Sequence, residues 1–179
     1  MLKINAKTLI MCAHIDDEFA MAPIIKAIAR KNPKNIRVTY CAERNNDPIR
    51  LKKLRREESF KSNALLGVKE KNIDFLNNKF VIDDLKLYIS TKEIYSYMKT
   101  LNSKFGYEQI FTLNYEGGHP DHDTLALLVN KFSKNNSKIS FFFPAYNSRE
   151  ILGIPLSVFK PLRKQESFFS SIQFGLFCW

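Results

Sequence analysis

Short apolar runs alternate with longer amphipathic stretches along most of this chain. Thr8–Ala13 is a nearly continuous apolar run, which is typical of a strand buried on both faces of a parallel sheet. The stretch Glu18–Lys31 that follows has apolar residues at helical spacing. Similar signals predict strands at Ile36–Cys41, Ile73–Leu76, Gln109–Leu113 and Lys138–Phe143, and helices at Arg50–Leu66, from Ser90 onward and at Asp121–Phe132. Strands separated by single helices predict βαβ units, and therefore an α/β fold with a mostly parallel sheet.

Local signals define several helix ends and faces. Gly67 follows the second predicted helix and suits its C-terminal cap. Ser90 and Glu93 have the spacing of a capping box at the start of the third. The helical spacing predicts the buried faces, with Phe19 in the first helix and Leu51, Leu54 and Leu65 in the second. No repeat or domain boundary interrupts the pattern, so we expect one domain over residues 1–179.

Composition and charge narrow the class of protein. A hydrophobic fraction of 45% and a charged fraction of 26% argue against general disorder. The net charge of +10 favours anionic partners such as phosphorylated substrates, nucleic acid or an acidic membrane. Three scattered cysteines without a CxxC pair argue against a disulfide framework and against a cysteine-built zinc site. We find no membrane-spanning run and no signal-peptide pattern, and therefore expect a cytoplasmic protein.

The loop after the first strand contains a histidine and two adjacent aspartates. His14 and Asp17 are three residues apart, so a turn that enters a helix can bring both side chains toward one point. Asp16 then lies close by without sharing the same ligand position. The alternative is that Asp16 or Asp17 caps the following helix, which is a common use of aspartate.

The loop after the fourth predicted strand contains the other two histidines of the chain. Pro120 suits the first turn of a helix and holds His119 extended just outside it. His122 shares the inward face of that helix with Leu125 and Val129. The alternative is a core histidine bonded to a backbone carbonyl. Because ligands of such folds bind beyond the carboxyl ends of the strands, and all three histidines lie in these two loops, we favour one joint site.

The residue types indicate a metal-dependent hydrolase. His14, Asp17 and His122 form a set of two imidazoles and one carboxylate, which suits Zn²⁺, with Fe²⁺ or another divalent ion as the alternative. Three protein ligands leave a position for water, as in a catalytic site. Asp16 is then placed to act as a general base and His119 to stabilise a tetrahedral species. Asp121 or Asp123 is expected to orient a histidine.

Two motifs, AHIDDE at Ala13–Glu18 and GGHPDHD at Gly117–Asp123, resemble those of the PIG-L/LmbE-like family of metal-dependent N-deacetylases. The resemblance is strongest over residues 5–135, and the stretch 144–179 is short or divergent. It implies a Rossmann-like three-layer sandwich and a zinc site. It also implies His14, Asp17 and His122 as metal ligands, Asp16 as general base and His119 as the residue that assists the tetrahedral intermediate and the leaving amine.

The resemblance extends between the two motifs. Leu54–Glu58 is similar to the family's second helix, in which an arginine contributes to the substrate pocket, and this implies Arg55 in that role. An ion pair between Arg55 and Glu58 is the alternative, because the two are three residues apart. Asp83 and Asp84 lie where the family often has an aspartate near the substrate. The loop at 41–47 departs from the family's acidic, glycine-containing pattern.

The resemblance implies removal of an N-acetyl group from an N-acetylglucosamine-type sugar conjugate, lipid- or nucleotide-linked, in surface-glycan biosynthesis. The basic then aromatic stretch at 157–179 indicates either a membrane-surface contact or, alternatively, a core helix or subunit contact. Rival functions are a metal-dependent phosphoesterase and a relative that binds glycan or nucleic acid without catalysis. We expect no specific nucleic-acid partner, because the basic residues are dispersed and no recognition motif is present.

Overall fold

The computed structural model describes residues 2–145, 149–151 and 154–156. Five parallel strands form one sheet in the order β3-β2-β1-β4-β5. They are β1 (Thr8–Cys12), β2 (Ile36–Tyr40), β3 (Ile73–Phe75), β4 (Gln109–Leu113) and β5 (Ile139–Phe143), each ending within one residue of the predicted bounds. A separate antiparallel pair joins β6 (Arg149–Ile151) to β7 (Ile154–Leu156). The predicted α/β fold with a parallel sheet is confirmed.

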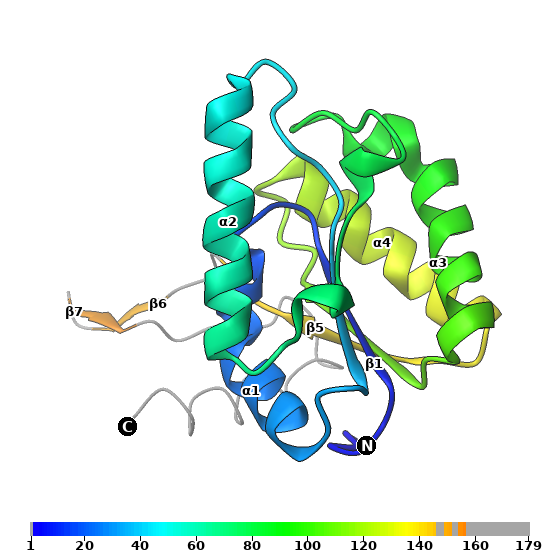
Figure 1. Cartoon of the computed structure of the whole chain (residues 1–179). Helices are drawn as coiled ribbons and strands as arrows, with labels where there is room; N and C mark the ends of the chain where they lie inside the picture. Colours follow the sequence, from blue (N-terminus) through cyan, green and yellow to red (C-terminus); the bar gives the residue numbers. More distant parts are fainter. Residues whose placement is uncertain (1, 146–148, 152–153, 157–179) are drawn as a thin grey trace.

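Among the described residues, four α-helices cover the two faces of this sheet, as can be followed in Figure 1. They are α1 (Ala22–Lys31), α2 (Ile49–Leu65), α3 (Thr91–Phe105) and α4 (Pro120–Asn135). Short 3-10 turns link the elements at η1 (Asp17–Met21), η2 (Glu70–Asn72), η3 (Leu76–Asn78) and η4 (Leu87–Ser90). Helices α1 and α2 lie on one face and α3 and α4 on the other, which gives the predicted three layers. No helix among the described residues is long and apolar enough to cross a membrane.

The central strand β1 explains why the sheet has an apolar layer on each face. Leu9 and Met11 belong to the core shared with α3 and α4, whereas Ile10 and Cys12 belong to the core shared with α1. All four side chains have no exposed surface. Alternate residues of a strand point to opposite faces, so a strand covered on both sides must be apolar throughout. Each fully buried aliphatic side chain stabilises the fold by about 1.5–3 kcal/mol.

The first predicted helix is divided in two. Residues Asp17–Met21 form η1, and the α-helix begins only at Ala22 with Pro23 in its first turn. Proline lacks an N–H and its ring clashes with the carbonyl four residues earlier, so a continuous α-helix through this point is disfavoured. The prediction that Phe19 is buried is therefore wrong, because the tighter turn leaves its side chain 75% exposed.

The predicted buried face of α2 is also wrong. Leu51, Leu54 and Leu65 are 39%, 48% and 80% exposed, respectively. The helix instead buries a polar face with Ser59 and Asn63. Asn63 Nδ2 donates to the Tyr40 hydroxyl at 2.7 Å and to the Ser59 carbonyl at 2.9 Å, so the buried amide nitrogen has acceptors on the sheet and on the helix itself.

The helix caps follow the prediction in one case of two. Gly67, at φ +87°, follows the C-terminus of α2 and confirms the predicted left-handed cap. The predicted capping box at Ser90 is wrong, because Ser90 makes no side-chain hydrogen bond at the start of α3. The chain enters α3 through the 3-10 turn η4, which ends at Ser90.

Candidate active site

The loop between β1 and η1 places the polar side chains of His14, Asp16 and Asp17 at the end of the sheet. Asp16 adopts a left-handed backbone at φ 100° and makes no side-chain hydrogen bond as a helix cap. Asp17 is buried, and its Oδ2 accepts the backbone N–H of His14 at 2.9 Å. The turn thus fixes His14 and Asp17 against each other, and it leaves the Asp16 carboxylate beside them in the same cavity.

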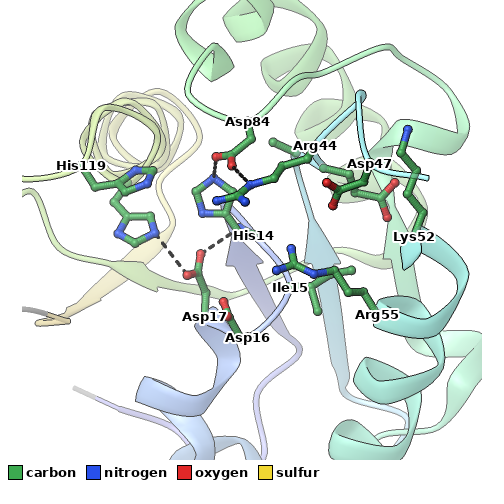
Figure 2. A pocket seen from close by; sticks show the side chains of 13 residues that line it. His14, Ile15, Asp16, Asp17, Arg44, Asp47, Lys52, Arg55, Asp84 and His119 are labelled. Atoms are coloured by element: carbon green, nitrogen blue, oxygen red, sulfur yellow. Dashed lines mark hydrogen bonds and ion pairs between the residues drawn. The ribbon is translucent and has the colours of Figure 1, made fainter. Parts of the chain in front are cut away.

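The start of α4 places the other two histidines opposite this loop. His119 is the N-cap residue, and its Nδ1 accepts the backbone N–H of Asp121 at 3.3 Å. His122 is one turn further into the helix and only 4% exposed, with its Nε2 3.2 Å from Asp17 Oδ1. Figure 2 shows His119 facing His14 and Asp17 across the end of the sheet.

The three imidazole rings form one cluster. The His14 ring centroid lies 4.9 Å from that of His119 and 5.3 Å from that of His122, and the last two are 4.4 Å apart. The structure therefore brings together the residues that the sequence predicted for one site from segments about a hundred positions apart. Asp17 joins the two sides, because its two oxygens contact the backbone of His14 and the ring of His122.

Asp121 is a buried carboxylate that holds His14. Its Oδ2 lies 2.9 Å from His14 Nε2 and also accepts the N–H of Leu85 at 2.7 Å, while Oδ1 accepts the N–H of Leu87 at 3.0 Å. Burial alone would raise the pKa of Asp121, but these hydrogen bonds lower it below its ordinary value. Burial would likewise lower the pKa of His14, but its contact with Asp121 raises it. Asp121 therefore takes the position expected of a residue that orients a histidine.

Asp123 has a different place. Its Oδ1 accepts the backbone N–H groups of Glu116 at 2.8 Å and Gly117 at 3.1 Å. These bonds order the loop in front of α4. Of the two aspartates that the sequence offered for orienting a histidine, Asp121 contacts His14, whereas these bonds of Asp123 hold the loop.

Asp84, in the segment between η3 and η4, also contacts His14. Its Oδ1 lies 3.0 Å from His14 Nε2 and its Oδ2 accepts the Arg44 Nε–H at 2.8 Å. The preceding Asp83 instead accepts the backbone N–H of Asn45 at 3.0 Å and serves the loop. The sequence indicated this acidic pair without separating its members. In the structure Asp83 forms a bridge with Glu43, and the next residue, Asp84, contacts His14.

A cavity of about 220 Å³ lies over these residues. Its lining includes His14, Asp16, Asp17, Arg44, Asp47, Lys52, Arg55, Asp84, His119 and His122. Arg55 reaches into it from α2 (Figure 2), and the predicted alternative of an ion pair with Glu58 is not seen. Helix α2 instead forms ion pairs through Arg56, whose Nε donates to Glu43 at 2.7 Å, and through Lys53, whose Nζ lies 3.9 Å from Glu57.

Asp16 and His119, which line the cavity with His14, also have shifted pKa values. Burial, with the negative charge of Asp17, raises the pKa of Asp16 above its ordinary value. Burial, with the nearby His122 and His14, lowers the pKa of His119. Perturbed acid–base groups in a polar cavity are typical of catalytic sites.

The donor set suits a divalent metal ion. One nitrogen from each of His14, His119 and His122 lies within 4.8 Å of the others, and His14, Asp84 and Asp121 form a second set at the same spacing. Asp17 adds a carboxylate beside His122. Nitrogen and oxygen donors without thiolate are those that zinc and iron accept in hydrolytic sites.

Comparisons with known proteins agree with this geometry. The family model described as PIG-L, GlcNAc-PI de-N-acetylase, matches residues 9–133 of the 179. The N,N'-diacetylchitobiose deacetylase of Pyrococcus horikoshii is 26% identical, with a TM-score of 0.55 over 73% of this chain and 50% of its own. The chain therefore spans half the length of that protein. No curated protein matches.

Two further solved structures share the fold at lower identity. A deacetylase of the teicoplanin biosynthetic pathway, solved as a triple mutant, is 14% identical, with a TM-score of 0.60 over 94% of this chain and 81% of its own. The deacetylase of the A40926 pseudoaglycone is 12% identical, with a TM-score of 0.60 over 84% of this chain and 70% of its own. At this identity the likeness establishes the Rossmann-like α/β fold.

Proposed function

Because this chain belongs to the PIG-L family, we propose that it is a metal-dependent N-deacetylase that releases acetate from an N-acetylated sugar conjugate. The observation that supports this most directly is the gathering of His14, Asp16, Asp17, His119 and His122 around one polar cavity. Water adds to the acetyl carbonyl carbon, the C–N bond breaks, and acetate and a free amino sugar leave.

We propose zinc as the metal and His14, Asp17 and His122 as its ligands. The 3.2 Å approach of Asp17 Oδ1 to His122 Nε2 and the 5.3 Å between the His14 and His122 ring centroids support this set. The chemistry that such an ion supplies is a lower pKa for water and polarisation of the amide carbonyl. Asp121 holds the His14 ring through Nε2, which is the kind of outer hydrogen bond that orients histidine ligands.

Asp16 is the proposed general base. Burial raises its pKa, which makes it a stronger base than an ordinary exposed aspartate. It accepts the proton of the attacking water and can return it to the leaving nitrogen. The guanidinium of Arg55 lies close enough to favour the ionised form of Asp16, so it assists the base as well as lining the substrate cavity.

His119 is the proposed stabiliser of the tetrahedral intermediate. Because Nδ1 accepts the N–H of Asp121, the neutral ring carries its proton on Nε2. Its lowered pKa keeps the ring neutral at pH 7. Nε2–H is therefore a hydrogen-bond donor to the oxyanion that forms when water adds to the carbonyl.

Acetate release tests this function. The wild-type protein, loaded with Zn²⁺, is incubated with N,N'-diacetylchitobiose and with nucleotide- and lipid-linked N-acetylglucosamine, and acetate is measured enzymatically. Asp16→Asn is the matched variant, because asparagine tolerates the left-handed backbone at this position. We expect it to retain the metal and lose about 10²–10⁴-fold in kcat. Equal activity in the variant and wild type would exclude Asp16 as the base.

His14→Ala separates metal binding from proton transfer. Removal of a ligand is expected to abolish stoichiometric zinc in elemental analysis, whereas Asp16→Asn keeps it. Equal loss of metal in both variants would show that Asp16 is a ligand. The phosphoesterase alternative predicts phosphate rather than acetate as the product, so the same assays distinguish it.

A further inference from the structure

Glu18 is a buried acidic residue that takes no part in the proposed chemistry. The residue is only 3% exposed, and its side chain does not line the cavity. A carboxylate that is removed from water needs hydrogen-bond donors in place of the solvent. The donors around Glu18 therefore indicate what this side chain does.

The two carboxylate oxygens of Glu18 bind two different segments. Oε2 accepts the backbone N–H of Asp16 at 3.0 Å, and Oε1 accepts the hydroxyl of Ser62 in α2 at 3.1 Å. The Tyr40 hydroxyl, at the end of β2, also hydrogen-bonds to this carboxylate. Glu18 therefore joins the turn that carries Asp16 to the neighbouring helix and strand.

The bond to Asp16 supports a strained backbone. Asp16 has φ 100° and ψ −20°, in the left-handed region that is unfavourable for a residue with a side chain. Its N–H is bound by Glu18, and its carbonyl accepts the N–H of Phe19 at 3.0 Å. Strained residues persist where the surrounding structure fixes them, and they cluster at functional sites. In this conformation Asp16 lines the cavity.

The bond to Ser62 also concerns Arg55. Ser62 and Arg55 are seven positions apart, which is two helical turns, so they lie on the same face of α2. Arg55 and Asp16 both line the cavity, and Figure 2 shows them on α2 and on the turn, respectively. The carboxylate of Glu18 thus connects the two elements that carry Asp16 and Arg55.

We propose that Glu18 is a positioning residue, whose buried carboxylate holds the Asp16 turn against α2 and so keeps the Asp16 carboxylate in place for proton transfer beside Arg55. The proposal rests on the deacetylase function for the role of Asp16, and on the hydrogen bonds of Glu18 for the link itself. Glu18 acts through Asp16, because its own oxygens are directed to the backbone and to α2.

Two other roles for Glu18 lead to different results. A residue that only stabilises the fold would change the free energy of unfolding but leave the turnover of the folded enzyme unchanged. A metal ligand would be needed for zinc binding, yet neither set of candidate metal-binding side chains in the described part of the chain includes Glu18. Turnover and zinc content therefore distinguish all three roles.

Glu18→Gln tests the positioning role in a double-mutant cycle with Asp16→Asn. Glutamine has one acceptor oxygen, so it cannot accept from both Asp16 and Ser62. With N,N'-diacetylchitobiose as substrate, we expect a kcat about 10–100-fold lower, KM within about twofold, and unchanged zinc in elemental analysis. In the Asp16→Asn background the same change should alter kcat by less than about twofold, because the group through which Glu18 acts is absent. An equal loss in both backgrounds, or a loss of zinc, would overturn the proposal.

Two serines of α2 provide a milder variant and its matched control. Ser62→Ala removes the hydroxyl that binds Glu18, whereas Ser59→Ala removes one that donates to the Arg56 carbonyl within the helix. We expect Ser62→Ala to lower kcat about threefold or more and Ser59→Ala to leave it unchanged. The same kcat in both variants would contradict the link to α2.

Amide hydrogen exchange tests the link without any substrate. We expect Glu18→Gln to speed the exchange of the Asp16 N–H about tenfold or more. The Ala42 N–H, which donates to the Ala13 carbonyl at 2.8 Å, should keep its protection. Unchanged exchange at Asp16 would reject the link, whatever the activity. Faster exchange at Asp16 in a protein whose wild type releases no acetate would support the link and reject the deacetylase function.

Discussion

Asp121 shows how one residue can serve both the fold and the site. Its carboxylate accepts two backbone N–H groups from the segment at 85–87 and contacts the His14 ring. These interactions join the first helix turn of α4, the loop after β1 and the segment before α3. A small displacement of this carboxylate would therefore move a proposed metal ligand.

We predict that Asp121→Ala destabilises the protein by about 2–5 kcal/mol, because it leaves the buried N–H of Leu87, the partly buried N–H of Leu85 and the His14 imidazole without their acceptor. It is also expected to weaken zinc affinity about 10–100-fold. Urea unfolding and a competitive zinc titration measure the two effects. Asp123→Ala is the matched control, since its carboxylate holds only the nearby loop, and it should cost about 1 kcal/mol. A similar zinc affinity in both variants would contradict the role of Asp121.

The sequence predicted the proposed site residues better than it predicted their partners. His14, Asp17, His119 and His122 lie together because parallel strands end at one edge of the sheet, which the order of elements already implied. Asp84 was not separable from Asp83, because which of two adjacent aspartates faces inward depends on the Glu43–Asp83 bridge. That pairing is between segments about forty residues apart, and no local pattern encodes it.

At the scale of elements, strands were predictable and helix faces only in part. Apolar runs such as that of β1 can form little other than a buried strand in this context. The predicted buried face of α2 was wrong because the inward face of this helix is polar and its outward face contains Leu51, Leu54 and Leu65. The assumption that leucines are buried therefore assigned the wrong face of the helix to the core. The exposed leucines belong to a helix that borders a polar cavity.

The cap of α2 gives a prediction at this scale. Gly67 has φ +87°, and a Cβ placed on it would lie 3.3 Å from the Cβ of Ala29 in α1. Gly67→Ala therefore meets both left-handed strain, about 1–2 kcal/mol, and a tight contact between two helices. Gly106, which follows α3 at φ +62°, has nothing within 4 Å of such a Cβ. We expect Gly106→Ala to lower the free energy of unfolding by the backbone strain alone, and Gly67→Ala to lower it further. Chemical denaturation measures both. Equal destabilisation by the two variants would show that α1 moves away from the added methyl group without a loss of stability.

At the scale of the whole molecule, the proposed metal ligands join both halves of the chain. A ligand that binds only the folded state stabilises it by RT ln(1 + [L]/Kd), about 4 kcal/mol at a thousandfold excess over Kd. We predict that Zn²⁺ raises the Tm of the wild-type protein by several degrees. His122→Ala should show no such rise, whereas His119→Ala, which replaces a residue outside the proposed ligand set, should keep it. Calorimetry with and without chelator measures all three. A rise that persists in His122→Ala would place the metal elsewhere.

The position of β1 in the sheet has a consequence for how the protein is made. β1 is first in sequence but third in the sheet order, paired on one edge with β2 and on the other with β4. While the chain is being synthesised, the β4-facing edge of this apolar strand stays open until Gln109–Leu113 has emerged. For that interval the nascent chain presents a bare strand edge, which is the kind of surface that chaperones bind and that aggregation begins from.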